Sequence, residues 1–156
     1  MSTNLHRKST HYRNAQALLL CVFVTVFVLD RSARILPRAG TEIVGTTLCL
    51  LGLLLMVVSI VSLRAVIQVA PAPRAGGHLV TSGLYRWLRH PIYTGLLLLL
   101  IGVFLRKPTV PVALASVLVA GFFVAKTTFE ERLLLERYPD YASYRARSWG
   151  LIPGLR

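Results

Sequence analysis

Two short stretches of the 156-residue chain concentrate the side chains that could carry out chemistry. The first runs from His78 to Gly95 and includes His90 and Tyr93, and the second runs from Lys126 to Glu131 and ends in two adjacent carboxylates. A carboxylate accepts strong charge-assisted hydrogen bonds from ligand hydroxyl or ammonium groups. A histidine can accept or release a proton near neutral pH. Together these residue types favour a site that binds a polar ligand and can move a proton.

Long apolar segments surround both stretches and must position them. Four segments stand out: Ala15–Leu29, Ile43–Leu63, Ile92–Leu105 and Thr109–Ala125. The second has 21 residues, enough to cross a hydrocarbon core of ~30 Å as a helix. The third has only 14 residues, or roughly 21 Å of helix. The third segment therefore either starts below the membrane surface or forms a tight hairpin with the fourth that turns at residues 106–108. Such a hairpin, which we expect, brings the two polar stretches together.

The composition excludes several classes of protein. Apolar residues make up 54% of the chain, charged residues only 15%, and the mean hydropathy is +0.61. Although the net charge is +12, the apolar residues form long uninterrupted runs, which is unlike a nucleic-acid-binding module. Cys21 and Cys49 lie inside apolar runs, so we expect neither a disulfide nor a metal site. We predict packing between helices at four glycines: Gly52, Gly95, Gly102 and Gly121.

We therefore predict an all-α, multi-pass integral membrane protein with about four transmembrane helices and a C-terminal interfacial helix. Residues 1–63 would hold two membrane helices, the first retained rather than cleaved as a signal peptide, and residues 64–156 a catalytic half. Thirteen Lys and Arg residues fall on the face that carries both termini and the middle loop, and five fall on the opposite face. The positive-inside rule then places both termini and the site on the cytoplasmic side.

The sequence after Lys126 reads as a helix that leaves the membrane and breaks at Tyr138 and Pro139. Residues 141–147 form a basic, aromatic stretch suited to the membrane interface. We expect Tyr138, Tyr141 and Tyr144 to form part of an aromatic belt there.

Leu79–Gly95, the pair Glu130 and Glu131, and the aromatic ending at 138–144 together resemble the isoprenylcysteine carboxyl methyltransferase family, which has phospholipid methyltransferases as relatives. The resemblance covers roughly the last 90 residues. It implies a membrane enzyme that transfers a methyl group from S-adenosyl-L-methionine (SAM) to a lipophilic acceptor. The acceptor would arrive laterally from the bilayer, and SAM from water.

The resemblance also implies roles for individual residues. It assigns cofactor contacts to Gln68, His78, Leu79, Val80, Tyr85, His90, Pro91, Ile92, Tyr93 and Glu130. It places Lys126 at the position that contacts the acceptor. Independently of the resemblance, the chemistry suggests a catalytic role for His90 or Glu131: if the acceptor is an amine, one of them would take up or release a proton, whereas an anionic acceptor needs no general base. The family typically has an arginine where this chain has Lys126, so the planar fork that suits a carboxylate acceptor is lost.

Several of the charged residues also have a simpler, structural interpretation. Adjacent helical residues point about 100° apart, so Glu130 would face the ligand while Glu131 pairs with Arg132 or Lys126. Arg86 and Arg89 could be anchors at the membrane surface. The acceptor and the choice among O-, S- and N-methylation stay open. One alternative function is a phosphatidylethanolamine-type N-methyltransferase, and another is a non-catalytic membrane anchor or assembly subunit.

Overall fold

The computed structural model describes the backbone of residues 2–68 and 79–154, and the side chains of residues 11–63 and 79–154. These residues fold into helices, with one isolated backbone bridge between Leu88 and Trp149. The elements are α1 (Ser2–Leu29), α2 (Thr41–Gln68), a short 3-10 helix η1 (Gly83–Arg86), α3 (Pro91–Arg106), α4 (Val110–Arg137) and α5 (Tyr141–Arg147). The predicted all-helical fold is confirmed.

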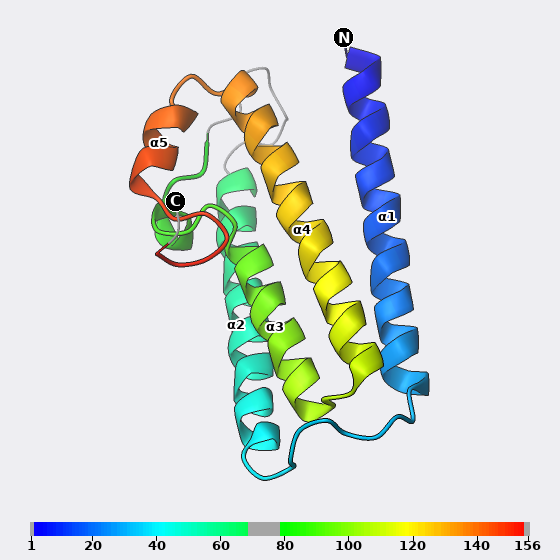
Figure 1. The fold of residues 1–156 in the computed structure, drawn as a ribbon. Helices are drawn as coiled ribbons and strands as arrows, with labels where there is room; N and C mark the ends of the chain where they lie inside the picture. Colours follow the sequence, from blue (N-terminus) through cyan, green and yellow to red (C-terminus); the bar gives the residue numbers. More distant parts are fainter. Residues whose placement is uncertain (1, 69–78, 155–156) are drawn as a thin grey trace.

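The four long helices run antiparallel, with α1 beside α4, α4 beside α3, and α3 beside α2 (Figure 1). The expected hairpin of α3 and α4 is present, and its turn falls at residues 107–109. The N-terminal end of α1, η1 and α5 lie at one end of the bundle, here called the α5 end. The α3–α4 turn and the α1–α2 loop lie at the other, here called the hairpin end.

Within the part of the chain that the structure describes, three helices are long and apolar enough to cross a membrane, over His11–Leu29, Thr41–Leu63 and Val110–Arg137. Helix α3 is shorter, as its 14-residue apolar run predicts. Helix α4 continues without a break beyond Ala125 to Arg137, so the carboxylate pair belongs to the same helix as the fourth apolar segment. It ends directly before Tyr138 and Pro139, where the sequence predicts a break. Large apolar side chains such as Leu54 and Val61 point outward, as expected for lipid-facing helices.

Helices α2 and α3 pack closely because glycines face one another at two levels. A Cβ atom added to Gly52 would lie 2.5 Å from the carbonyl oxygen of Gly95, and one added to Gly45 would lie 2.7 Å from that of Gly102. Only glycine permits such close backbone contact. The prediction of packing glycines is confirmed for Gly52, Gly95 and Gly102. It is wrong for Gly121, which lies on an open surface with nothing within 4 Å.

At the hairpin end, Asp30, Lys107 and Thr109 form a polar group that we call the Asp30 cluster. The Thr109 hydroxyl donates to Asp30 Oδ2 at 2.7 Å, and the backbone N–H of Ser32 donates to Oδ1 at 3.0 Å. Lys107 Nζ lies 3.6 Å from Oδ2 and donates to the Asp30 carbonyl at 2.7 Å. These hydrogen bonds hold the pKa of the Asp30 carboxyl below its usual range. The cluster ties the start of the α1–α2 loop to the α3–α4 turn.

At the α5 end, the C-terminal segment folds back onto the residues before α3. The Arg89 N–H donates to the Trp149 carbonyl at 2.9 Å, and the Trp149 N–H donates to the Trp87 carbonyl at 2.8 Å. The Thr94 hydroxyl donates to the Leu151 carbonyl at 2.7 Å. Residues 148–151 are thereby fixed beside the first turn of α3.

The expected aromatic belt is wrong for Tyr141 and Tyr144, which are 1% and 3% exposed. The Tyr144 hydroxyl donates to the carbonyl of Tyr85, which docks α5 onto η1. Burial raises the pKa of both phenols. Their period of three places them on one face of α5, and that face covers the segment before α3 instead of meeting lipid headgroups.

Candidate active site

The two polar stretches of the sequence meet at the α5 end. Helix α3 begins at Pro91, which suits the first helical position because its missing N–H needs no partner there. This start places His90 at the N-cap and Tyr93 one turn into the helix. The Tyr93 hydroxyl donates to Glu130 Oε1 of α4 at 2.8 Å, while Arg89 Nε donates to Glu131 Oε1 at 2.7 Å. The hairpin therefore brings both carboxylates against the His90 segment.

The first subsite is the Glu130 cluster, made of His90, Tyr93, Lys126 and Glu130. The rings of His90 and Tyr93 are parallel within 6°, with centroids 5.7 Å apart. His90 Nδ1 lies 4.0 Å from Glu130 Oε2. The Glu130 side chain is 32% exposed, so its carboxylate is accessible from outside. Aromatic faces beside a reachable carboxylate provide a surface for a flat or cationic ligand group and an acceptor for its hydroxyl or ammonium protons.

Lys126 joins this cluster to α1. Its Nζ donates to Gln16 Oε1 at 2.6 Å and lies 3.6 Å from Glu130 Oε1. The ammonium also lies over the rings of Tyr93 and Phe123, at 5.3 and 5.8 Å from their centroids. Lys126 thus neutralises part of the Glu130 charge and fixes the position of α4 relative to α1.

The second subsite is the Glu131 cluster, made of Arg89, His90, Glu131 and Arg145. Glu131 Oε1 accepts from Arg89, and Oε2 lies 3.3 Å from Arg145 Nε. The expected pairing of Glu131 with Arg132 or Lys126 is wrong, since the rotation of about 100° per residue turns Glu131 toward α5 and the segment before α3. Lys126 pairs instead with Glu130.

Arg89 is buried and holds several elements together. Its side chain is 3% exposed, and Nη1 donates to the carbonyls of Arg145 at 3.1 Å and Ser148 at 2.6 Å. A surface anchor would leave its head in water, so the anchor interpretation of Arg89 is wrong. Arg86 matches that interpretation better, because it is exposed and its guanidinium lies over the ring of the exposed Trp87.

His90 lies between the two subsites. Its side chain is 8% exposed, and Nε2 lies 3.4 Å from Glu131 Oε1 without hydrogen-bond geometry. A buried nitrogen without a hydrogen bond is costly, so this position calls for a water, a ligand or a proton-transfer partner. The imidazole faces Glu130 through one nitrogen and Glu131 through the other.

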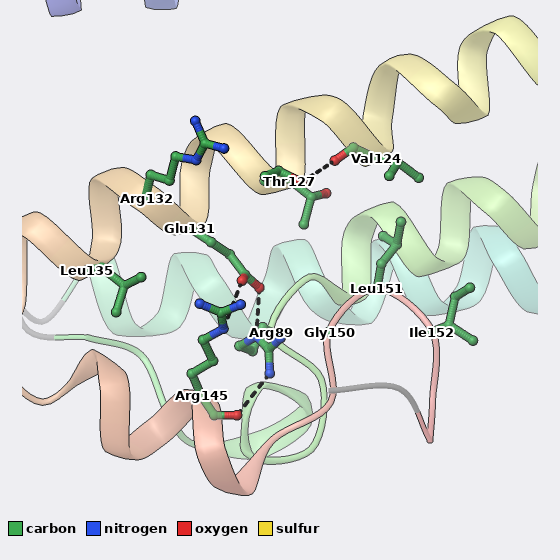
Figure 2. A pocket seen from close by; sticks show the side chains of 11 residues that line it. Arg89, Val124, Thr127, Glu131, Arg132, Leu135, Arg145, Gly150, Leu151 and Ile152 are labelled. Atoms are coloured by element: carbon green, nitrogen blue, oxygen red, sulfur yellow. Dashed lines mark hydrogen bonds and ion pairs between the residues drawn. The ribbon is translucent and has the colours of Figure 1, made fainter.

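A cavity of about 470 Å³ opens beside the Glu131 cluster. In Figure 2 the guanidinium groups of Arg89 and Arg145 converge on the Glu131 carboxylate, and Leu151 and Ile152 line the cavity from the C-terminal segment. Its volume falls within the ~300–1,000 Å³ range of ligand pockets. The cavity combines a polar end with apolar walls.

The remaining predicted cofactor contacts differ in burial. Tyr85 and Pro91 are buried, and Leu79, Val80 and Ile92 are half-buried. Gln68 is the last residue of α2 with its side chain outside the described part, and His78 lies outside the described residues altogether. Among the described residues, no three His, Cys, Asp or Glu side chains form a group that could hold a metal ion, and both cysteines are free.

Sequence reasoning missed two participants, Gln16 of α1 and Arg145 of α5. Gln16 is a polar residue at the start of an apolar segment, and that isolation was a usable signal because polar groups in membrane helices usually face a protein partner. No feature of the sequence indicated Arg145, because its contact with Glu131 depends on how α5 turns back after Pro139.

The family model described as "Phospholipid methyltransferase" matches residues 41–141. The match begins at the start of α2, so it extends upstream of the last 90 residues, in which the resemblance lies. A curated relative, "Cobalt-zinc-cadmium resistance protein CzcN" of Cupriavidus metallidurans, is 35% identical over 85 residues. That alignment covers 53% of this chain and 38% of the relative, so the chain spans well under half of the relative's length. No solved structure matches.

Proposed function

We propose that the chain, which belongs to the phospholipid methyltransferase family, transfers a methyl group from SAM to a lipophilic acceptor at the cytoplasmic face of the membrane. The observation that carries this function is the convergence of His90 and Tyr93 with Glu130, inside the matched region. Membership of this family supports methyl transfer as the type of reaction. The geometry supports the finer assignment of the methyl donor to the Glu130 cluster.

The residues of this cluster fit the chemical groups of SAM. When bound, SAM supplies a methyl group activated by its sulfonium charge. Glu130 Oε2 has no hydrogen-bond donor among the described residues, so it can accept from a ribose hydroxyl or the ligand's ammonium. The parallel faces of His90 and Tyr93 can contact the adenine ring or the sulfonium. Because methyl transfer is an in-line displacement, positioning by these groups would be the main catalytic contribution, which in favourable cases reaches ~7–11 kcal/mol.

The sidedness rests on the distribution of charge. The first turns of α1, the start of α3 and α5 lie at the α5 end (Figure 1), and in the sequence thirteen of the eighteen Lys and Arg residues fall in the stretches 7–13, 64–89 and 126–156. The positive-inside rule assigns that end to the cytoplasm. SAM would then enter from the cytoplasm, and the acceptor from the inner leaflet.

A second candidate is N-methylation of a phosphatidylethanolamine-type amine. It is favoured by His90, whose Nε2 lies 3.4 Å from Glu131 Oε1 while Nδ1, the nitrogen left to accept a proton, lies 4.0 Å from Glu130 Oε2 on the side of the proposed donor site. An ammonium must lose a proton before it can attack a methyl group, and a neutral histidine backed by a carboxylate can accept that proton. Lys126 also suits an amine better than a carboxylate acceptor, because it lacks the planar fork of arginine.

Titration of S-adenosylhomocysteine into the full-length protein in detergent, followed by calorimetry, tests donor binding. We expect saturable micromolar binding by the wild type and none by Glu130→Ala or His90→Ala. Glu136→Ala is the matched control, since Glu136 is exposed on α4 outside both clusters. Absence of binding by the wild type would contradict the proposed function and favour a non-catalytic membrane anchor. Melting curves of each variant establish that it is folded.

A further inference from the structure

A second cavity, of about 300 Å³, lies between α3 and α4. Its α4 wall consists of Val117 and three small residues, Ala113, Ser116 and Ala120, and its α3 wall includes Leu97 and Ile101. The three small residues share one helical face because they are spaced by three and four positions. Ile101 is 50% exposed, so the cavity opens outward between the two helices, where the bilayer would lie.

The two cavities lie along the same face of α4. Ala120 lines the apolar cavity, and Val124, one helical turn further on, lines the larger one. From Ala113 to Val124 the helix rises about 16 Å. This length matches half of a ~30 Å hydrocarbon core, which is the depth of a hydrocarbon chain in a single leaflet. Because the two cavities follow each other along one face of α4, we treat them together as one groove, whose length suits such a chain.

The groove ends in positive charge. The larger cavity is lined by Arg89, Arg132 and Arg145, against the single carboxylate of Glu131. Arg89 is committed to Glu131 and to backbone carbonyls. Arg132 is exposed on α4, and the Arg145 side chain is 47% exposed. The end of the groove thus has an excess of two positive charges, counting His90 as neutral, and both accessible cations are guanidinium groups suited to phosphate.

We propose that this groove binds one anionic phospholipid, with a hydrocarbon chain along Ala113–Val124 and the phosphate at Arg132 and Arg145. The groove is separate from the Glu130 cluster, because Glu130 points about 100° away from Glu131 around α4 and contacts Tyr93 and Lys126 instead. A lipid bound there covers the outer side of the Glu131 cluster. Its binding does not depend on the proposed methyl transfer.

Phosphatidylglycerol is a suitable probe, because it is anionic and has no amine to be methylated. Its affinity for the detergent-solubilised full-length protein can be measured by native mass spectrometry. Ala120→Leu fills the groove and should weaken binding by about tenfold. Arg132→Gln removes one phosphate contact and should weaken binding by about fivefold. Ser116→Leu provides a second groove-filling variant if Ala120→Leu does not fold.

Each variant has a matched control on the same helix. Ala125→Leu and Arg137→Gln lie at exposed positions that line neither cavity, and both should bind the lipid like the wild type. Dioleoylglycerol, which lacks the phosphate, should bind at least fivefold more weakly than phosphatidylglycerol. Inorganic phosphate alone should not compete at millimolar concentration.

Three results would overturn this assignment. The first is wild-type affinity in both groove-filling variants, and the second is equal binding of the neutral lipid. The third is competition between phosphatidylglycerol and S-adenosylhomocysteine, which would assign the larger cavity to the methyl donor. Lipid binding without S-adenosylhomocysteine binding would contradict only the proposed methyl transfer, and the reverse result would contradict only the lipid groove.

Discussion

The two ends of the bundle both bury charged groups, but they do so differently. At the hairpin end, both carboxylate oxygens of Asp30 accept hydrogen bonds, and the Asp30 cluster lines neither described cavity. At the α5 end, Glu131 borders a cavity of about 470 Å³, and the neighbouring His90 nitrogen has no hydrogen bond. A carboxylate whose two oxygens both accept hydrogen bonds from neighbouring residues has a structural role, because it links the loops that carry those residues. A polar cluster that borders a cavity and includes a nitrogen without a hydrogen bond can take a ligand.

The largest expected effect on stability is at Arg89. Arg89→Met leaves the Glu131 carboxylate buried without its hydrogen bond from Arg89 Nε. Breaking a buried ion pair lowers the free energy of unfolding by about 3–5 kcal/mol. We expect the low end of that range, because Arg145 and His90 still face Glu131. Thermal melts in detergent measure the change.

The double variant Arg89→Met with Glu131→Leu sharpens this test. Because it removes both charges, it should regain most of the stability that Arg89→Met loses. If Arg89→Met melts like the wild type, the Glu131 cluster does not hold the α5 end together.

The next largest effects are expected at the glycines between α2 and α3, and they should differ between the two ends of the bundle. Gly52→Ala and Gly45→Ala should each destabilise the protein by about 1–3 kcal/mol, because the added methyl group meets backbone atoms of α3. Gly52 contacts the N-terminal half of α3, at Gly95, whereas Gly45 contacts its C-terminal end, near the hairpin turn. We therefore expect only Gly52→Ala to weaken S-adenosylhomocysteine binding as well.

Gly121→Ala is the control for these variants. Nothing lies within 4 Å of its added Cβ, so the change should be neutral or slightly stabilising through helix propensity. Equal loss of stability in all three variants would show that the close α2–α3 contact is not their cause.

Two buried tyrosines of α5 provide a matched pair of smaller effect. Tyr144→Phe removes the hydrogen bond to the Tyr85 carbonyl and should cost about 0.5–1.5 kcal/mol. Tyr141→Phe should cost nothing in stability, because the Tyr141 hydroxyl is buried without a hydrogen bond. Thermal melts of the two variants test the difference. A larger loss in Tyr141→Phe would show that its hydroxyl has a partner.

The smallest expected effect is at Asp30 and depends on pH. The lowered pKa of Asp30 means that its ionised form stabilises the fold at pH values above the unfolded pKa of about 3.9. This stabilisation is lost as pH falls toward the lower folded pKa. Asp30→Asn should therefore melt below the wild type at pH 7, and the difference should shrink below about pH 4. A difference that is independent of pH would contradict the ionised role of Asp30.

Much of the fold could be predicted from the sequence, because the length and hydropathy of a segment indicate whether it forms a membrane helix. The hairpin of α3 and α4 follows from a 14-residue apolar segment beside a turn at Lys107 and Pro108. The end of α4 follows from Tyr138 and Pro139, since the residue before a proline disfavours helix.

The candidate site was predictable only in part. Local spacing predicts that Glu130 and Glu131 point in different directions, but it does not name their partners. The pairing of Glu131 with Arg145 and the burial of Tyr141 depend on α5 folding back over the segment before α3. No local pattern encodes that return, because its contacts join residues more than 40 positions apart, such as Arg89 and Ser148.

Transfer of label from methyl-labelled SAM into a lipid extract tests the central claim most directly. The account predicts that the wild-type protein in membranes transfers label to the lipid phase, and that Glu130→Gln reduces the rate by about 10–100-fold through loss of a charge-assisted contact. Glu136→Gln should transfer label at the wild-type rate. Equal transfer by Glu130→Gln and the wild type would contradict the assignment of the methyl donor to the Glu130 cluster.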